Sequence, residues 1–389
     1  MKKVCFALAI ILSAFASLTP RHCAGQGIPI FGPEKAVEIH GLSFDAMEPF
    51  VSHDGSLLFF NSLNSGGNTN IYYATRQDDT TFVFGGLVEG CYDSTANHLD
   101  GVPSADSLGR FYWVSLRNYP AQLDNLHVGS VSGTTVTGIH RVHGNINAGV
   151  AGWIIMDACV NTAGYFLAYA GARFDFVNGT CGNLPCESQL GLAIKSNDST
   201  FNKLPAMDYI LQNVNNASYL IYAPQLSDDN LRLYFTRLKK NTVNTEICVA
   251  VRPVPGAAFD PPVVLVSEPG AVPEAPTFSP GEHAMYYHKK VNGTHQIFMR
   301  VKTATTALAG HRPSPFGISP NPVSSVLNCH LPAGKNYTIR VFSMTGRLCM
   351  VTEDRQINVA SLPEGIYWIS AATAEGTISQ KFIKADAGN

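Results

Sequence analysis

One short phrase recurs five times in this sequence of 389 residues. It consists of Pro or a small residue, an apolar residue, Ser or Asp with Gly or Asn, and then an aromatic-rich segment. With Asp54, Asp106, Thr162, Asp228 and Pro280 taken as equivalent, the copies are spaced by 52, 56, 66 and 52 residues. Four short strands in a unit of about 40–50 residues are typical of a β-propeller blade.

Each phrase supplies two strands joined by a turn, and further strand-like segments follow it, such as 70–74 and 246–250. The fifth unit ends near residue 301 without a fourth strand, and residues 31–39 have the character of that missing strand. We therefore expect the N-terminal strand to complete the last blade, because a closed ring protects its edge strands. The prediction is an all-β chain with a five-bladed propeller. Six blades and a β-sandwich are the alternatives, since evenly spaced strands fit either fold.

The N-terminus has the layout of a secretory signal peptide. Lys2 and Lys3 precede an apolar run at 4–18, and small residues follow up to Gly25. A positive start, a short apolar core and small residues before the cut define such a peptide, predicted here at 1–25. An N-terminal membrane anchor is the alternative, but no later stretch has the ~20 apolar residues of a span. The net charge of −2 without a basic block argues against nucleic-acid binding.

Seven of the nine cysteines follow the predicted cleavage site. Cys181 and Cys186 enclose a turn-forming loop in a chain bound for an oxidising compartment, which predicts a local disulfide. A metal or redox pair would need CxxC spacing or further ligands nearby. The pairing of the others is left open, with Cys329 and Cys349 as a candidate pair: Cys91, Cys159, Cys248, Cys329 and Cys349.

A second unit follows the repeats. Residues 302–317 contain Thr, Ala and two prolines and are predicted to be a linker between a propeller at 26–301 and a domain at 318–389. This domain carries Pro-Asn-Pro, Tyr-x-Ile-x-Val-Phe, Thr-Gly-Arg, Leu-Pro-x-Gly-Ile-Tyr and a final Lys-Phe-Ile-Lys, in that order. The motif residues are Pro320, Asn321, Pro322, Gly346, Arg347, Gly365, Tyr367, Lys381 and Lys384.

These motifs resemble the type A C-terminal sorting domain of the type IX secretion system, over about residues 318–385. The resemblance implies a small Ig-like β-sandwich that is recognised by the secretion machinery, directs passage across the outer membrane and is then typically removed. Residues 27–305 resemble the TolB-like, WD40-like propeller repeats. That second resemblance favours interaction over chemistry, although fold analogy is weak support for function.

Acidic residues stand just before or at the starts of the predicted innermost strands, where equivalent positions of a propeller converge on the central channel. They are Glu48, Asp100, Asp157 and Glu274, with Tyr222 in the fourth blade. Such a set could hold Ca²⁺, which prefers oxygen ligands, or supply a glycosidase with its two carboxylates. The alternative is that they are solvated residues at loop-to-strand junctions. Trp113, Trp153, Tyr222 and Tyr287 are interpreted as inter-blade packing, with stacking on sugars or peptides as the alternative.

The sequence contains no GxSxG, HExxH, P-loop or strand-GxGxxG motif. The leading hypothesis is therefore a non-enzymatic binding module for a protein, peptide or glycan, exported to the cell surface or the medium. A carbohydrate-active hydrolase using the channel carboxylates is the second hypothesis. A surface scaffold or matrix protein is the third.

Overall fold

The computed structural model describes residues 27–306 and 316–385, apart from 65–67, 93–97, 176–177, 332–335, 344–346 and 374–375. The predicted signal peptide, most of the predicted linker and Gly346 lie outside these residues. Within them the regular secondary structure is almost entirely β-strand, with one short α-helix, α1 (Met207–Ile210), and one 3₁₀ helix, η1 (Pro280–Glu282). No helix in this part of the chain is long and apolar enough to cross a membrane.

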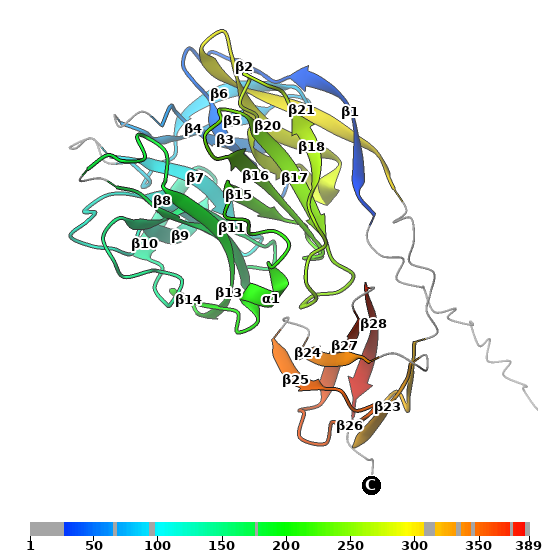
Figure 1. Ribbon diagram of the computed structural model, residues 1–389. Coiled ribbons are helices and arrows are strands. Elements are labelled where there is room, and N and C mark those ends of the chain that lie inside the picture. The colour runs from blue at the N-terminus through cyan, green and yellow to red at the C-terminus, as the bar shows by residue number, and fades with distance from the viewer. Residues whose placement is uncertain are drawn as a thin grey trace, which may run out of the picture.

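Residues 27–306 form five antiparallel sheets of four main strands (Figure 1). From the innermost strand outward, blade 1 holds β3 (Met47–Val51), β4 (Leu57–Asn61), β5 (Ile71–Arg76) and β6 (Thr81–Leu87), with β2 (Glu38–His40) added at its edge. Blade 2 holds β7 (Asp100–Ala105), β8 (Arg110–Ser115), β9 (Leu126–Ser132) and β10 (Thr135–Arg141). Blade 3 holds β11 (Trp153–Val160), β12 (Phe166–Arg173), β13 (Glu187–Asn197) and β14 (Thr200–Lys203). Blade 4 holds β15 (Tyr219–Leu226), β16 (Arg232–Lys239), β17 (Thr245–Val251) and β18 (Val263–Ser267). Blade 5 holds β19 (Glu274–Phe278), β20 (Ala284–Val291), β21 (Thr294–Thr305) and β1 (Pro29–Ala36).

The ring is closed as the sequence predicts. β1 pairs antiparallel with β21, from Pro29 opposite Thr305 to Ala36 opposite Phe298. The inner strands also form a closed circuit of contacts, β3 with β7, β7 with β11, β11 with β15, β15 with β19 and β19 with β3. The five-bladed propeller is therefore confirmed over the alternatives of six blades and a sandwich.

The repeated phrase has a physical basis in the turn that follows each inner strand. The first polar residue after the inner strand accepts a hydrogen bond from the backbone at the start of the next strand, and this closes the hairpin. These residues are Ser52, Asp106, Asn161, Ser227 and Ser279. The sequence equivalence of Asp54, Thr162, Asp228 and Pro280 with Asp106 was thus wrong by one or two residues. Ser and Asp neighbours in the same turn have similar propensities, so composition alone does not fix the register.

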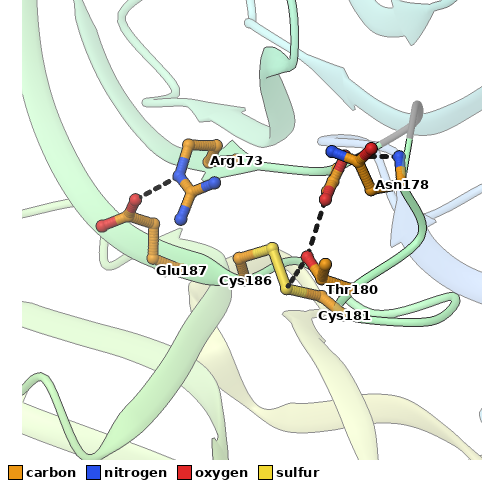
Figure 2. The surroundings of a disulfide bond; sticks show 7 residues. Arg173, Asn178, Thr180, Cys181, Cys186 and Glu187 are labelled. Atoms are coloured by element: carbon orange, nitrogen blue, oxygen red, sulfur yellow. Dashed lines mark hydrogen bonds and ion pairs between the residues drawn. A yellow bond between two sulfur atoms is a disulfide. The ribbon is translucent and has the colours of Figure 1, made fainter.

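Blade 3 accounts for the long third step. The connection between β12 and β13 contains the predicted disulfide, Cys181–Cys186, with the two Cα atoms 5.2 Å apart. Figure 2 shows it beside the ion pair of Arg173 and Glu187, which joins the ends of β12 and β13. The segment between β14 and β15, which includes α1, adds the remaining length.

The other described cysteines are unpaired thiols. Cys91, Cys159, Cys248 and Cys329 are buried, and burial raises the pKa of Cys159 and Cys329 to about 11. The candidate pairing of Cys329 with Cys349 is not formed, because both are unpaired thiols.

The C-terminal residues form a two-sheet β-sandwich. One sheet contains β22 (Gly317–Ser319), β23 (Val326–His330) and β26 (Gln356–Asn358). The other contains, in spatial order, β25 (Leu348–Thr352), β24 (Thr338–Ser343), β27 (Gly365–Thr373) and β28 (Gly376–Lys384). Their facing side chains, among them Leu327, Ile339, Val341, Ile369 and Phe382, make one core.

Several residues of the predicted sorting motif stabilise this sandwich. Asn321, between the cis peptides that precede Pro320 and Pro322, donates to the carbonyl of Lys381 and accepts from the amide of Ile383. The hydroxyl of Tyr367 donates to the carbonyl of Pro363, and its ring stacks on Phe382. The side chain of Arg347 is exposed at the start of β25, and Gly365 begins β27. Lys384 is buried at the end of β28.

Candidate functional site

The inner strands share an unusual backbone feature four residues before the polar residue that closes each hairpin. Glu48, Val102, Ala223 and Ala275 have φ angles of 51°, 58°, 48° and 54°, and each precedes a proline. Positive φ is strained for residues with a Cβ, so the surrounding contacts must hold it in place. The pairing with the second strand shifts register at the same point in all five blades. Blade 3 has Asp157-Ala158 at the equivalent position.

Hydrogen bonds between neighbouring blades hold these strained residues. The backbone N–H groups of Val102, Ala223, Ala275 and Glu48 donate to the side chains of Asn61, Asp157, Thr236 and His288 over 3.0–3.1 Å. In blade 3 the N–H of Ile155 donates to Asn125 over 2.9 Å. Each acceptor belongs to the preceding blade, so the five bonds form a ring around the channel.

Three of the predicted carboxylates converge here. Glu48 and Asp157 occupy equivalent positions in blades 1 and 3, and Glu274 is one residue earlier in blade 5. Glu48 interacts electrostatically with both of the others. Its Oε1 accepts a hydrogen bond of 3.0 Å from Asn64, whereas its Oε2 is buried without a hydrogen-bond partner among the described residues.

Glu274 is held between two side chains. It accepts a hydrogen bond from the hydroxyl of Tyr222, and its Oε2 lies 3.2 Å from Nε2 of His288. Because Nδ1 of His288 accepts the N–H of Glu48, the ring proton must be on Nε2, where it is donated to Glu274. Tyr222, Glu274 and His288 therefore form one hydrogen-bonded chain across the junction of blades 4, 5 and 1.

Burial and mutual repulsion favour the neutral forms of these acids. Burial, with the nearby charges of Asp157 and Glu274, raises the pKa of Glu48 to about 8. Burial is also the main cause that raises the pKa of Asp157 to about 7, opposed by the hydrogen bond from Ala223. The pKa of the Tyr222 hydroxyl is raised well above its usual value by burial and by Glu274. The cluster therefore carries less negative charge near neutral pH than its composition suggests.

Asp100 has a different environment. It accepts hydrogen bonds from Arg117 at 2.8 and 3.0 Å and from the Trp113 indole at 3.3 Å, and it pairs with His98 at 3.1 Å. It anchors Arg117, the second residue of the loop between β8 and β9. Burial raises its pKa, and Arg117 opposes this effect.

The channel is narrow at this end. A cavity of about 30 Å³ is lined by Glu48, Asp157 and the neighbouring inner-strand residues, and one of about 40 Å³ lies toward the other end. Such volumes hold a water molecule or two. Among the described side chains, no group of three or more His, Cys, Asp or Glu residues is arranged to hold a metal ion. Trp113 and Tyr287 are fully buried in the packing between blades, as interpreted, and are closed to sugar stacking.

Sequence reasoning missed His288, Asn61 and Asn64. His288 lies opposite Glu274 in the pairing of β19 with β20, and Asn61 lies opposite Met47 in blade 1. Polar residues in the second strand, directly across from the inner-strand register shift, were the signal that could have identified them.

Loops of unequal length surround this end of the propeller, which we call the loop end. Because the second strand of each blade runs back toward the start of the inner strand, the loops that follow β4, β8, β12, β16 and β20 all lie here. Those at 62–70, 116–125 and 174–186 are long, whereas those at 240–244 and 292–293 are short. The long loops belong to blades 1, 2 and 3, so they are grouped on one side of the channel.

Solved structures similar to this chain include several carbohydrate-active enzymes. A family 117 glycoside hydrolase from the marine bacterium Zobellia galactanivorans is 12% identical, with a TM-score of 0.46, over 74% of this chain and 97% of the other. An α-L-arabinofuranosidase from Podospora anserina is 11% identical, with a TM-score of 0.45, over 73% and 98%. An endo-arabinase from Bacteroides thetaiotaomicron is 12% identical, with a TM-score of 0.41, over 72% and 98%. No curated protein matches the sequence significantly.

Residues 317–385 match the family described as the secretion system C-terminal sorting domain. The match begins and ends with the two-sheet sandwich, from β22 to the residue after β28. The prediction of a sorting domain is therefore confirmed. The protein is a cargo of the type IX secretion system and is exported to the cell surface or the extracellular medium.

Proposed function

We propose that this protein is an exported binding module that holds a protein, peptide or glycan at the loop end of its propeller. The observation that carries the proposal is the distribution of exposed apolar side chains. Leu63, Tyr92, Val150, Leu184 and Val243 are exposed in propeller loops at this end, whereas only Leu108 is exposed in a described loop at the other. The larger number of exposed apolar side chains at this end favours it over the other end as the interaction surface.

Loops at this end are fixed to the scaffold, among them the two that present Val150 and Leu184. Asp100 holds Arg117 at the start of the loop at 116–125, and the hydroxyl of Tyr119 in that loop accepts the N–H of Gly152, two residues after Val150, over 2.5 Å. The disulfide and the Arg173–Glu187 pair restrain the loop at 174–186. Pre-ordered loops lose little conformational entropy on binding, which favours affinity.

A glycoside hydrolase is the second candidate, because Glu48, Asp157 and Glu274 converge from three blades. Glycosidases act with two carboxylates on opposite sides of a sugar. The channel cavity of about 30 Å³ is roughly a tenth of the smallest usual ligand pocket, about 300 Å³. The carboxylates are also engaged in holding Ala223, Tyr222 and His288. The geometry therefore supports binding better than catalysis.

We place the signal peptide at 1–25 and the propeller within 26–301, with the linker at 302–317, although β21 continues to Thr305. The TolB-like, WD40-like resemblance of the propeller remains part of this proposal and agrees with a role in interaction.

The test is an array of glycans and peptides probed with the purified full-length protein, with each bound compound then incubated and analysed by mass spectrometry. We expect binding without product formation. Release of shortened oligosaccharides, abolished by Glu274→Gln, would establish the hydrolase instead. Self-association without any ligand in analytical ultracentrifugation would support a matrix role and contradict the proposal.

A further inference from the structure

The second sheet of the sorting domain has one face in the core of the sandwich and one face turned outward. On β24, Ile339 and Val341 belong to the core. Arg340 and Phe342 alternate with them, so their side chains are on the outward face. Phe342 is nevertheless 0% exposed and does not belong to the core cluster. Ser370, opposite Arg340 on β27, is also 0% exposed. This outward face is therefore covered.

The propeller provides the cover. Gly256, between β17 and β18, has φ of +86°, and a Cβ built on it would lie 2.5 Å from a ring carbon of Phe342. The guanidinium of Arg340 lies 4.3 Å from the ring centre of Tyr209 in α1. Figure 1 shows β24 in the part of the sorting domain that faces α1.

We propose that the outward face of β24 and β27 is an intramolecular docking surface for the propeller. Phe342 seats on the bare backbone of Gly256, and Arg340 stacks on Tyr209. Only glycine permits the close approach at position 256, and it also accommodates the positive φ. A guanidinium over a tyrosine ring adds a cation–π contact. The partner is thus a defined patch of this same chain.

The patch exists only after two parts of the propeller have packed together. Tyr209 belongs to the connection between blades 3 and 4, and Gly256 belongs to a loop of blade 4. The N–H of Phe259 donates to the carbonyl of Ile210 over 3.0 Å and joins the two segments. Docking therefore requires that blades 3 and 4 have folded. It also covers the aromatic side of the sorting domain until that domain is separated from the propeller.

The docked face also buries polar groups, which opposes docking. The Trp368 indole Nε1, on the residue opposite Phe342, and the Ser370 hydroxyl are buried without a hydrogen-bond partner among the described residues. Buried polar groups without partners weaken an interface, because water would satisfy them on separation. This composition suits a contact that must be released.

The experiment introduces a side chain under the Phe342 ring in the full-length protein. Asn tolerates positive φ, so Gly256→Asn keeps the backbone while its side chain collides with Phe342. We expect a larger radius of gyration in small-angle X-ray scattering and stronger acrylamide quenching of tryptophan, because the half-buried Trp368 becomes more accessible. Gly270→Asn is the matched control, because Gly270 has φ of +85° and no heavy atom lies within 4 Å of the point that a Cβ would occupy there.

A second variant tests the same contact without changing position 256. Phe342→Ala should expand the molecule in the same way while leaving the melting temperature of the sorting domain unchanged, since the ring is outside that core. Val351→Ala, exposed on the neighbouring strand β25, is its control. If both Gly256→Asn and Phe342→Ala leave scattering and quenching equal to their controls, the docking surface does not exist. A fall in sorting-domain melting with Phe342→Ala would assign the ring a role inside the sandwich instead.

Discussion

Single residues near the channel combine strain and burial. Glu48 has positive φ, a buried Oε2 without a described partner and a raised pKa, and its N–H depends on a histidine from blade 5. Features of this kind persist only where the surroundings fix them. In this propeller they lie at the junction between blades 5 and 1.

The raised pKa values predict how stability depends on pH. In the unfolded chain Glu48 and Asp157 ionise near pH 4, whereas in the folded chain they ionise near pH 8 and 7. Between about pH 4 and pH 8 the folded state binds more protons than the unfolded state. The stabilisation that these two groups contribute is therefore complete below about pH 4 and is lost as the pH rises to 8.

Glu48→Gln and Asp157→Asn should therefore raise the melting temperature at pH 8 and change it little at pH 5. Each kcal/mol gained corresponds to about 2–4 °C for a domain of this size. Thermal unfolding at the two pH values measures the effect, with the exposed Asp208→Asn as control. Equal shifts at pH 5 and pH 8 would show that the acids are ionised throughout.

The inter-blade hydrogen bonds give a second prediction. Thr236→Val keeps the shape of the side chain but leaves the buried N–H of Ala275 without its acceptor. Such a loss costs about 1–3 kcal/mol. The free energy of unfolding in denaturant should fall by that amount, whereas Thr137→Val, exposed on β10, should change it little. An unchanged value for Thr236→Val would mean that the ring of hydrogen bonds does not stabilise the fold.

At the level of elements, the molecule depends on β1. This strand comes from the N-terminus, yet it covers the edge of β21, and Phe31 packs with the core between blades 4 and 5. An uncovered edge strand is a template for pairing with another chain.

Deletion of residues 1–36 should therefore cause self-association and loss of stability. The side chains of Ile28 and Phe31 alone contribute about 2–4 kcal/mol. Size-exclusion chromatography and thermal melting measure the change, with deletion of residues 1–26 as the matched control. A monomer that melts like the control would show that the ring does not need this closure.

The strands and their grouping into blades are the features that the sequence predicts best. The five phrases and the orphan strand at 31–39 predict five blades and their closure, because turn residues and strand length are local properties. The contacts of His288, Asn61 and Asn64 depend on how neighbouring blades meet, and single-strand patterns contain no such information. Asp100 was grouped with the other acids because it stands near a strand start. Its two-residue offset before Val102 is enough to direct it to Arg117 and Trp113.

At the scale of the whole molecule, one chain contains both the propeller and the sorting domain. The sandwich at 317–385 is the sorting domain, and we expect it to direct the export of the propeller. Deletion of residues 318–389 should therefore retain the propeller in the periplasm, as measured by cell fractionation. The full-length Gly270→Asn variant should be exported normally. Normal delivery of the truncated protein to the surface would show that the sorting signal lies outside residues 318–389.

In our proposal the loop end binds the ligand, while the channel carboxylates stabilise the fold. The most direct measurement is the affinity for the best array ligand of two variants of the full-length protein. One is the double variant Glu48→Gln and Asp157→Asn, and the other replaces residues 174–186 with a two-residue turn. We predict unchanged affinity for the first and a loss of at least tenfold for the second. The reverse pattern, with binding lost in the carboxylate variant and kept in the loop variant, would contradict the account and assign the ligand to the channel.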